Sequence, residues 1–178
     1  MTTLFEIIGS AGKGEIVRTL AAEAGLDDSQ AEEALRALLP EIGRAVRRTG
    51  ESRSGAAAAH AVMRDERYQR YLDDPPALRQ PDAAQEGERM LSDVLEDDEE
   101  RGRLVRRVAA AIEPHEDAVR TLLPLVAVLA MAALGRQLCE PSPGIPWFGT
   151  REGDHFDAPL LEALTALFEH DDERAKPQ

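Results

Sequence analysis

The sequence predicts an all-α protein, a compact bundle of helices, and three observations support this fold class. Hydrophobic residues make up 43% of the chain but aromatic residues only 4%, so Ala, Leu and Val must fill the core, and Ala and Leu favour helices. Apolar residues recur at spacings of three and four, the period of an amphipathic helix. Two segments with an internal proline also resemble each other, EEALRALLP at 32–40 and EDAVRTLLP at 116–124.

The N-terminal region predicts a short segment followed by two helices. Residues 2–8 are apolar, and the glycine-rich residues 9–14 interrupt them. The amphipathic helix that follows should end at Gly25, because glycine adopts the left-handed conformation of a helix C-terminus without strain. Residues 27–29, two Asp and a Ser, supply candidate N-caps for the next helix.

Pro40 lies inside the apolar stripe of this next helix. A proline there removes one backbone hydrogen bond and kinks or breaks a helix. Because the apolar period continues across it, we expect one kinked, continuous helix rather than two separate ones. Residues 49–55 then read as a loop, 56–72 as a further helix, and 73–82, which contain Pro75 and Pro76, as an exposed linker.

The second half of the chain predicts three more helices. Asp82 is a candidate cap for the first, and the acidic residues 96–100 are expected to form a solvated loop. Another helix covers the apolar positions of 104–112. Pro114 then stands in the first turn of a helix that is apolar all round over 122–134. Since a membrane-spanning helix needs about 20 apolar residues, this shorter run predicts a buried core helix and no membrane span.

The two proline-containing segments indicate a duplicated helical unit. Their Glu, Ala, Arg, Leu-Leu and Pro residues match in register, although chance similarity between two Ala- and Leu-rich helices is the alternative. The residues expected to have a structural role are Leu38, Leu39, Pro40, Leu122, Leu123 and Pro124.

The expected organisation is one helical domain with a C-terminal appendage. We expect the domain at 1–138, in two related halves at about 1–72 and 82–138, a Pro- and Gly-rich linker at 139–156, an amphipathic helix at 157–170, and a disordered tail at 171–178. On the helix at 157–170, Leu160, Leu164 and Phe168 share one face and form a possible docking surface, for this chain or for another.

Three segments carry a resemblance to a known family: GLDDSQAEEALRALLPEI at 25–42, GERMLSDVL at 87–95 and LLPLVAVLAMAALGRQ at 122–137. Together they resemble the DUF937 or YidB-like proteins, a bacterial family of unknown function, over residues 1–138. The resemblance implies a compact helical bundle of homeodomain-like topology and no catalytic residue. The sequence departs from the family at 96–100, where members often carry a Gly-containing turn.

Charge and cysteine content restrict the possible partners and setting. The formal net charge of −13 repels phosphate backbones and anionic lipids, so a nucleic-acid partner is not expected. We interpret the local basic clusters as solvated helix faces; these are Arg44, Arg47 and Arg48, and Arg101, Arg103, Arg106 and Arg107. The single cysteine, Cys139, rules out an intrachain disulfide and indicates a reducing, cytoplasmic setting.

No catalytic constellation is found in the sequence. The glycine-rich residues 9–14 lack the spacing of a phosphate-binding loop and follow no predicted strand. Asp154, His155 and Asp157 are weak candidates for metal ligands, but turn formation and helix capping explain the same residues. We therefore expect neither a catalytic residue, a cofactor, a metal nor a small-molecule ligand.

Three functional hypotheses follow. The first is a non-enzymatic protein-interaction or structural protein that binds a partner or a second copy of itself. The second is a DNA-binding module, suggested only by the topology that the family resemblance implies. The third is a weak metal-binding or enzymatic protein that uses residues 153–157.

Overall fold

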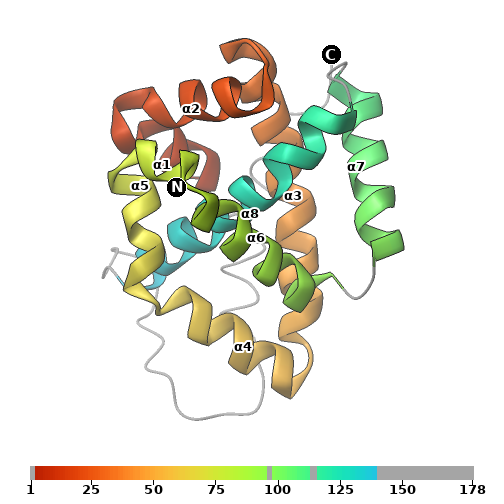
Figure 1. The fold of residues 1–178 in the computed structure, drawn as a ribbon. Coiled ribbons are helices and arrows are strands. Elements are labelled where there is room, and N and C mark those ends of the chain that lie inside the picture. The colour runs from red at the N-terminus through yellow and green to blue at the C-terminus, as the bar shows by residue number, and fades with distance from the viewer. Residues whose placement is uncertain (1–2, 96–97, 113–115, 140–178) are drawn as a thin grey trace.

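The computed structural model describes residues 3–95, 98–112 and 116–139, and in these ranges all regular structure is helical (Figure 1). This confirms the all-α prediction. The elements are α1 (Leu4–Ser10), η1 (Ala11–Gly14), α2 (Glu15–Ala24), α3 (Asp28–Gly50), α4 (Arg53–Met63), η2 (Glu66–Gln69), α5 (Arg70–Asp73), η3 (Pro75–Arg79), α6 (Pro81–Val94), α7 (Asp98–Ile112) and α8 (Glu116–Cys139), where η denotes a 3-10 helix.

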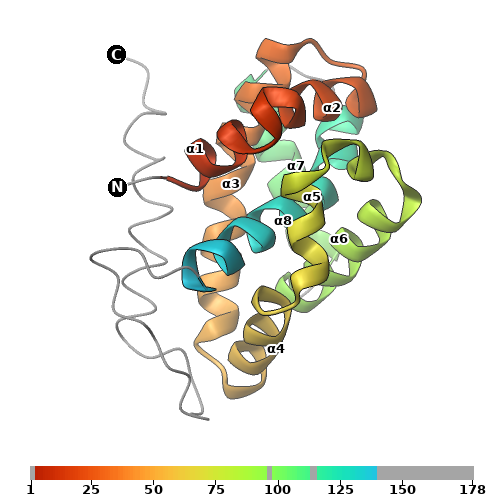
Figure 2. The same ribbon diagram turned by 90° about the vertical axis from the view of Figure 1, so that its left-hand side faces the viewer.

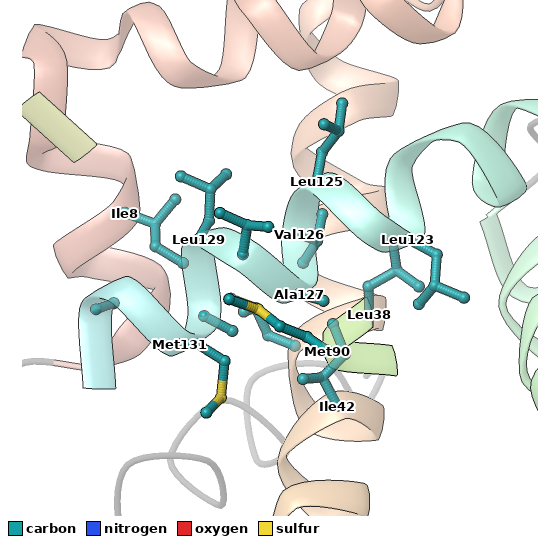
Figure 3. Packing of buried hydrophobic residues seen from close by; sticks show 14 of the residues in the cluster. Ile8, Leu38, Ile42, Met90, Leu123, Leu125, Val126, Ala127, Leu129 and Met131 are labelled. Carbon is teal, nitrogen blue, oxygen red and sulfur yellow. The ribbon is translucent and has the colours of Figure 1, made fainter. Parts of the chain in front are cut away.

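Helix α8 is the central element of the bundle. It packs against every other α-helix from α1 to α7, and in both views it lies between α2 at one end and α4 at the other (Figures 1 and 2). Every residue from Leu122 to Leu134 is buried, which confirms the predicted core helix. Figure 3 shows Ile8 of α1, Leu38 of α3 and Met90 of α6 packed around it.

By length and composition, the segment Glu116–Gln137 of α8 is apolar enough to cross a membrane. Within the bundle, however, 89% of its most apolar window is buried. The core helix of a globular protein has the same length and composition, so the apolar character of α8 is accounted for by its packing against the other helices.

Both repeated segments are helical: residues 32–40 lie inside α3, and residues 116–124 form the start of α8. Both helices continue through their proline, Pro40 or Pro124, which confirms the expected continuity. The matched Arg bonds the matched Glu in each: Arg36 to Glu32 at 2.6 Å and Arg120 to Glu116 at 2.7 Å. The side chains of Leu38, Leu39, Leu122 and Leu123 are all fully buried.

Two glycines permit the closest helix contacts of α8. A Cβ atom on Gly87 of α6 would lie 2.1 Å from the carbonyl oxygen of Pro124, and one on Gly135 would lie 2.2 Å from that of Met63. Real Cβ atoms do not approach backbone so closely, so at these two points the backbones of α6 and α8, and of α4 and α8, meet only because no side chain intervenes. Gly87 and Gly135 belong to the segments that carry the family resemblance, and packing is the role that they have here.

The N-terminal helices begin and end as their local sequences dictate. Asp27 and Gln30 form a capping box at the start of α3, in which the backbone N–H of Gln30 donates to Asp27 Oδ1 at 2.8 Å. Gly25 ends α2 with φ at 67°, as predicted. Gly12, Lys13 and Gly14 all have positive φ, and this turn separates α1 from α2.

The boundaries predicted around α4 were wrong. The expected loop at 49–55 is short, because α3 continues to Gly50 and α4 already begins at Arg53. The Ser52 hydroxyl accepts a hydrogen bond from the Gly55 amide at 3.1 Å, as an N-cap does. The expected helix at 56–72 is also divided, since α4 ends at Met63 and two shorter helices follow.

The expected linker at 73–82 is largely exposed, as predicted, but the expectation that it lacks regular structure was wrong. This region forms η3, with Pro75 and Leu78 buried, and the Pro75 ring packs against Gly12. Of the two paired prolines, Pro75 is buried and Pro76 is exposed, so this turn packs on the bundle with one side and faces solvent with the other. The cap predicted at Asp82 was wrong as well, because α6 begins one residue earlier at Pro81, with Gln80 at the N-cap.

The solvated loop expected at 96–100 was wrong over its described part. Helix α7 begins at Asp98, and Asp98, Glu99 and Glu100 form its first turn, where the helix dipole favours carboxylates. The linker at 139–156, apart from Cys139 at the end of α8, lies outside the described residues, as do the helix at 157–170 with Leu160, Leu164 and Phe168, and the tail at 171–178.

Candidate anion-binding pocket

A pocket of about 320 Å³ lies between α3 and α7, which stand side by side in Figure 1. Leu95 and Leu104, both at most 5% exposed, contribute apolar surface to it. The rest of its described lining is charged: Glu41, Arg44, Arg47 and Arg48 from α3, and Glu100 and Arg107 from α7. We call this hollow the arginine pocket.

Glu41 orients two of the guanidinium groups. Arg107 donates from Nη1 to both carboxylate oxygens, at 2.9 Å and 3.1 Å, and Arg44 donates to Oε1 at 2.8 Å. The Glu41 side chain is only 14% exposed, whereas those of Arg44 and Arg107 are 52% and 61% exposed. A largely buried carboxylate thus holds two solvent-accessible cations, one from each helix.

A second ion pair, between Arg48 of α3 and Glu100 of α7, joins the helices at the same pocket. Glu100 belongs to the first turn of α7, so the dipole of that helix also favours its negative charge. Both ion pairs between the helices therefore fix guanidinium groups beside one hollow.

The chemistry available to the arginine pocket is anion recognition. A guanidinium group has five N–H donors in a planar fork and stays protonated throughout the physiological pH range. An arginine that bonds one carboxylate oxygen retains further donors for an incoming ligand. Such groups bind carboxylate or phosphoryl oxygens well but transfer no proton at neutral pH, and the two glutamates of the lining, Glu41 and Glu100, are themselves paired with arginines.

The sequence alone does not reveal this pocket. Along the chain, Arg44, Arg47 and Arg48 and the arginines of 101–107 form two separate clusters, and each is typical of a solvated helix face. The structure brings the first cluster beside Arg107, because α3 packs against α7. Arg101, Arg103 and Arg106 do not line the pocket; Arg101 bonds Glu88 of α6, and Arg103 pairs with Glu99. The spacing of 44, 47 and 48 on one helix face was the only local signal.

A second, more open hollow of about 930 Å³ lies between η2, α5 and the end of α8. Three of its polar side chains are joined by hydrogen bonds: Arg136 donates to Gln69 at 3.1 Å and to Asp73 at 2.7 Å, and Gln69 Nε2 donates to the Ala132 carbonyl at 2.9 Å. These bonds attach η2 and α5 to α8, and this structural role accounts for them.

A buried tyrosine links α5 to α6. Tyr71 is fully buried; its hydroxyl donates to Glu86 Oε2 and accepts from Arg70, both at 2.6 Å. Burial, followed by the bond to Glu86, raises the pKa of Tyr71 above its ordinary value. The tyrosine therefore stays neutral over the physiological range and is explained as a packed, hydrogen-bonded core residue.

The metal-ligand candidates Asp154, His155 and Asp157 lie outside the described residues. Within the described ranges, no three His, Cys, Asp or Glu side chains are grouped so that they could hold a metal ion. The structural residues predicted around Pro40 and Pro124 lie in the core and do not line either hollow.

The family model described as "Bacterial protein of unknown function (DUF937)" matches residues 6–137. This range contains the whole arginine pocket and the repeated segments of α3 and α8. Comparison with curated proteins gave no match, and neither did comparison with solved structures.

Proposed function

The chain belongs to the DUF937 family of bacterial proteins, and we propose that it is a non-enzymatic protein that binds an acidic segment of a partner protein in its arginine pocket. The observation that carries this proposal is the convergence of arginines from α3 and α7 around one hollow, two of them held by Glu41. This arrangement favours binding over catalysis, because arginine does not exchange its proton at neutral pH.

The charge of the whole chain supports a short acidic segment as the ligand. With a formal net charge of −13, the protein repels extended polyanions at long range. A short anionic segment that reaches the arginine pocket is attracted locally, within the Debye length of about 8 Å at physiological salt. Self-association through the same contact remains part of this proposal, since the chain itself is rich in acidic segments.

The homeodomain-like topology remains a hypothesis that rests on the family resemblance. DNA binding by analogy with that topology is the less favoured reading, because the helix expected to read DNA should present several basic residues. Helix α8, the second proline-containing helix, is instead buried in the core. A gel-shift assay at low salt with genomic fragments tests this alternative directly.

The test of the proposal is peptide binding by the full chain. A fluorescein-labelled Glu-rich peptide is titrated at low salt with the native protein and with Arg44→Gln, Arg107→Gln and the control Arg18→Gln. Arg18 is 75% exposed on α2 and outside the pocket. We expect each pocket variant to weaken binding by about tenfold, a change equivalent to about 1.4 kcal/mol, and the control to leave it unchanged.

In the native state, Arg44 and Arg107 share Glu41, so either variant leaves this carboxylate with one cation. Circular dichroism of each variant establishes that the helices are retained. The proposal is wrong if the native protein does not bind the peptide, or if the control weakens binding as much as the pocket variants do.

A further inference from the structure

We infer that the group which the arginine pocket receives is a phosphoryl group, carried on a phosphorylated side chain of the partner protein, in preference to a carboxylate. This inference rests on the proposed function and specifies its ligand. It follows from what already occupies the guanidinium groups, from the way in which they are arranged, and from their surroundings.

The native pocket already contains carboxylates. Glu41 bonds Arg44 and Arg107, and Glu100 bonds Arg48. An incoming carboxylate can bond the donors that the resident carboxylates leave over, but it brings no more charge than each of them does. A phosphoryl group carries a charge of about −1.5 to −2 at pH 7 and three acceptor oxygens. It therefore brings more negative charge and more hydrogen-bond acceptors than a resident carboxylate does.

The arrangement of the arginines suits a group with several oxygens. Arg44, Arg47 and Arg48 come from one face of α3 and Arg107 from α7, so donors approach the hollow from two sides. Planar guanidinium forks match phosphate oxygens in pairs. A phosphoryl group presents three acceptor oxygens and up to two negative charges, whereas a carboxylate presents two oxygens and one charge, so the phosphoryl group can accept from more of these donors at once.

The surroundings strengthen such a contact. Leu95 and Leu104 are buried beside the charged groups, so apolar surface replaces water on one side of a bound group, while the side chains of Arg44 and Arg107 stay more than half exposed. The hollow of about 320 Å³ also has room for a phosphoryl group together with the waters that bridge it to the arginines.

The test compares two peptides that differ at one position, phosphoserine in one and Glu in the other, with flanking sequence kept identical. Each is titrated against the full chain by fluorescence anisotropy at pH 7.5 and at pH 5.5. We expect the phosphopeptide to bind about tenfold more tightly at pH 7.5. Its advantage should shrink at pH 5.5, because the phosphoryl group gains a proton with a pKa of about 6.

Variants of the pocket arginines test whether the preference for the phosphopeptide arises in the arginine pocket. Arg44→Gln and Arg107→Gln should reduce the preference for the phosphopeptide, whereas Arg18→Gln should retain it. Equal affinity for both peptides, with Arg44 and Arg107 still required, overturns the phosphoryl inference and leaves the proposed function standing. If neither peptide binds, the proposed function fails as well.

Vesicles distinguish the source of the phosphoryl group. Phosphatidic acid in a phosphatidylcholine vesicle presents a phosphomonoester on a lipid surface, and we expect no Arg44-dependent binding to such vesicles, because the net charge of −13 opposes approach to an anionic membrane. Arg44-dependent binding to these vesicles that is tighter than binding to the phosphopeptide would overturn the assignment to a protein ligand.

Discussion

At the scale of single residues, Gly87 meets the backbone of α8 with no room for a methyl group. We predict that Gly87→Ala destabilises the protein by at least about 1–3 kcal/mol, the cost of overpacking a core, because its Cβ would lie 2.1 Å from the Pro124 carbonyl oxygen. The measurement is urea unfolding followed by circular dichroism at 222 nm.

Gly102 provides the matched control on α7. It also lies inside a helix, but a Cβ there would come no closer than 3.8 Å to its nearest neighbour, the flexible end of Arg106. Gly102→Ala should therefore stabilise the protein by about 0.5–1 kcal/mol, since alanine is the better helix former. If both variants change the unfolding free energy in the same direction, the close contact between α6 and α8 is not as described.

The roles of Gly25 and Gly87 differ in whether the neighbouring residues in the sequence can predict them. Gly25 is predictable, because a glycine after an amphipathic stretch is a helix terminus. Gly87 is not, because its requirement arises from Pro124, on a helix far along the chain. From the sequence alone, a glycine inside a helical pattern indicates only that the helix is less stable there than it would be with alanine.

At the scale of elements, the capping box of α3 fixes where the longest helix of the N-terminal half begins. Asp27 Oδ1 accepts a hydrogen bond from the backbone N–H of Gln30 at 2.8 Å, and Gln30 Oε1 accepts one from the backbone N–H of Asp27 at 3.2 Å. We predict that Asp27→Ala lowers the free energy of unfolding by about 1 kcal/mol, the usual cost of losing an N-cap. Thermal and urea unfolding measure the effect.

The neighbouring Asp28 gives the control for this element. It stands in the first turn of α3 and approaches Arg18 at 3.9 Å, with both side chains more than 60% exposed. An exposed pair of this kind contributes little, so Asp28→Ala should cost less than Asp27→Ala. An equal loss from both variants would show that charge near the helix start, and not the capping hydrogen bond, stabilises α3.

The predictions of helices and turns were correct where the signals are local, and wrong where packing between helices determines the structure. The continuity of α3 through Pro40 followed from the apolar period on both sides of it. By contrast, Pro75 and Pro76 indicated an exposed linker, whereas Pro75 packs against Gly12 and Leu78 is buried. Prolines report that a regular helix cannot continue, but they do not report whether the turn they make is solvated.

At the scale of the whole molecule, the arginine pocket exists only because α3 packs against α7. Each basic cluster, seen alone, is compatible with a solvated face, and the overall charge of −13 gives no indication of a cationic hollow. The pairing of Arg107 with Glu41 joins residues far apart in the chain. Such convergence depends on how helices cross, which the periodicity of a single helix does not determine.

The position of α8 leads to a prediction for the folding of the entire domain. The sequence suggests two related halves, about 1–72 and 82–138, yet α8 packs against helices from both of them. Its central residues, from Leu125 to Leu134, are all buried. Because neither half encloses α8 without the other, we expect the domain to unfold as one cooperative unit.

Native-state hydrogen exchange measures this directly. Amides of α8 between Leu125 and Leu134 should exchange only through global unfolding, so their exchange free energy should equal the unfolding free energy from urea titration. Core amides of α3 and α6, one helix from each half, should give the same value. If α3 and α6 instead open at separate free energies, the halves are independent folding units, and α8 must remain packed on one of them when the other opens.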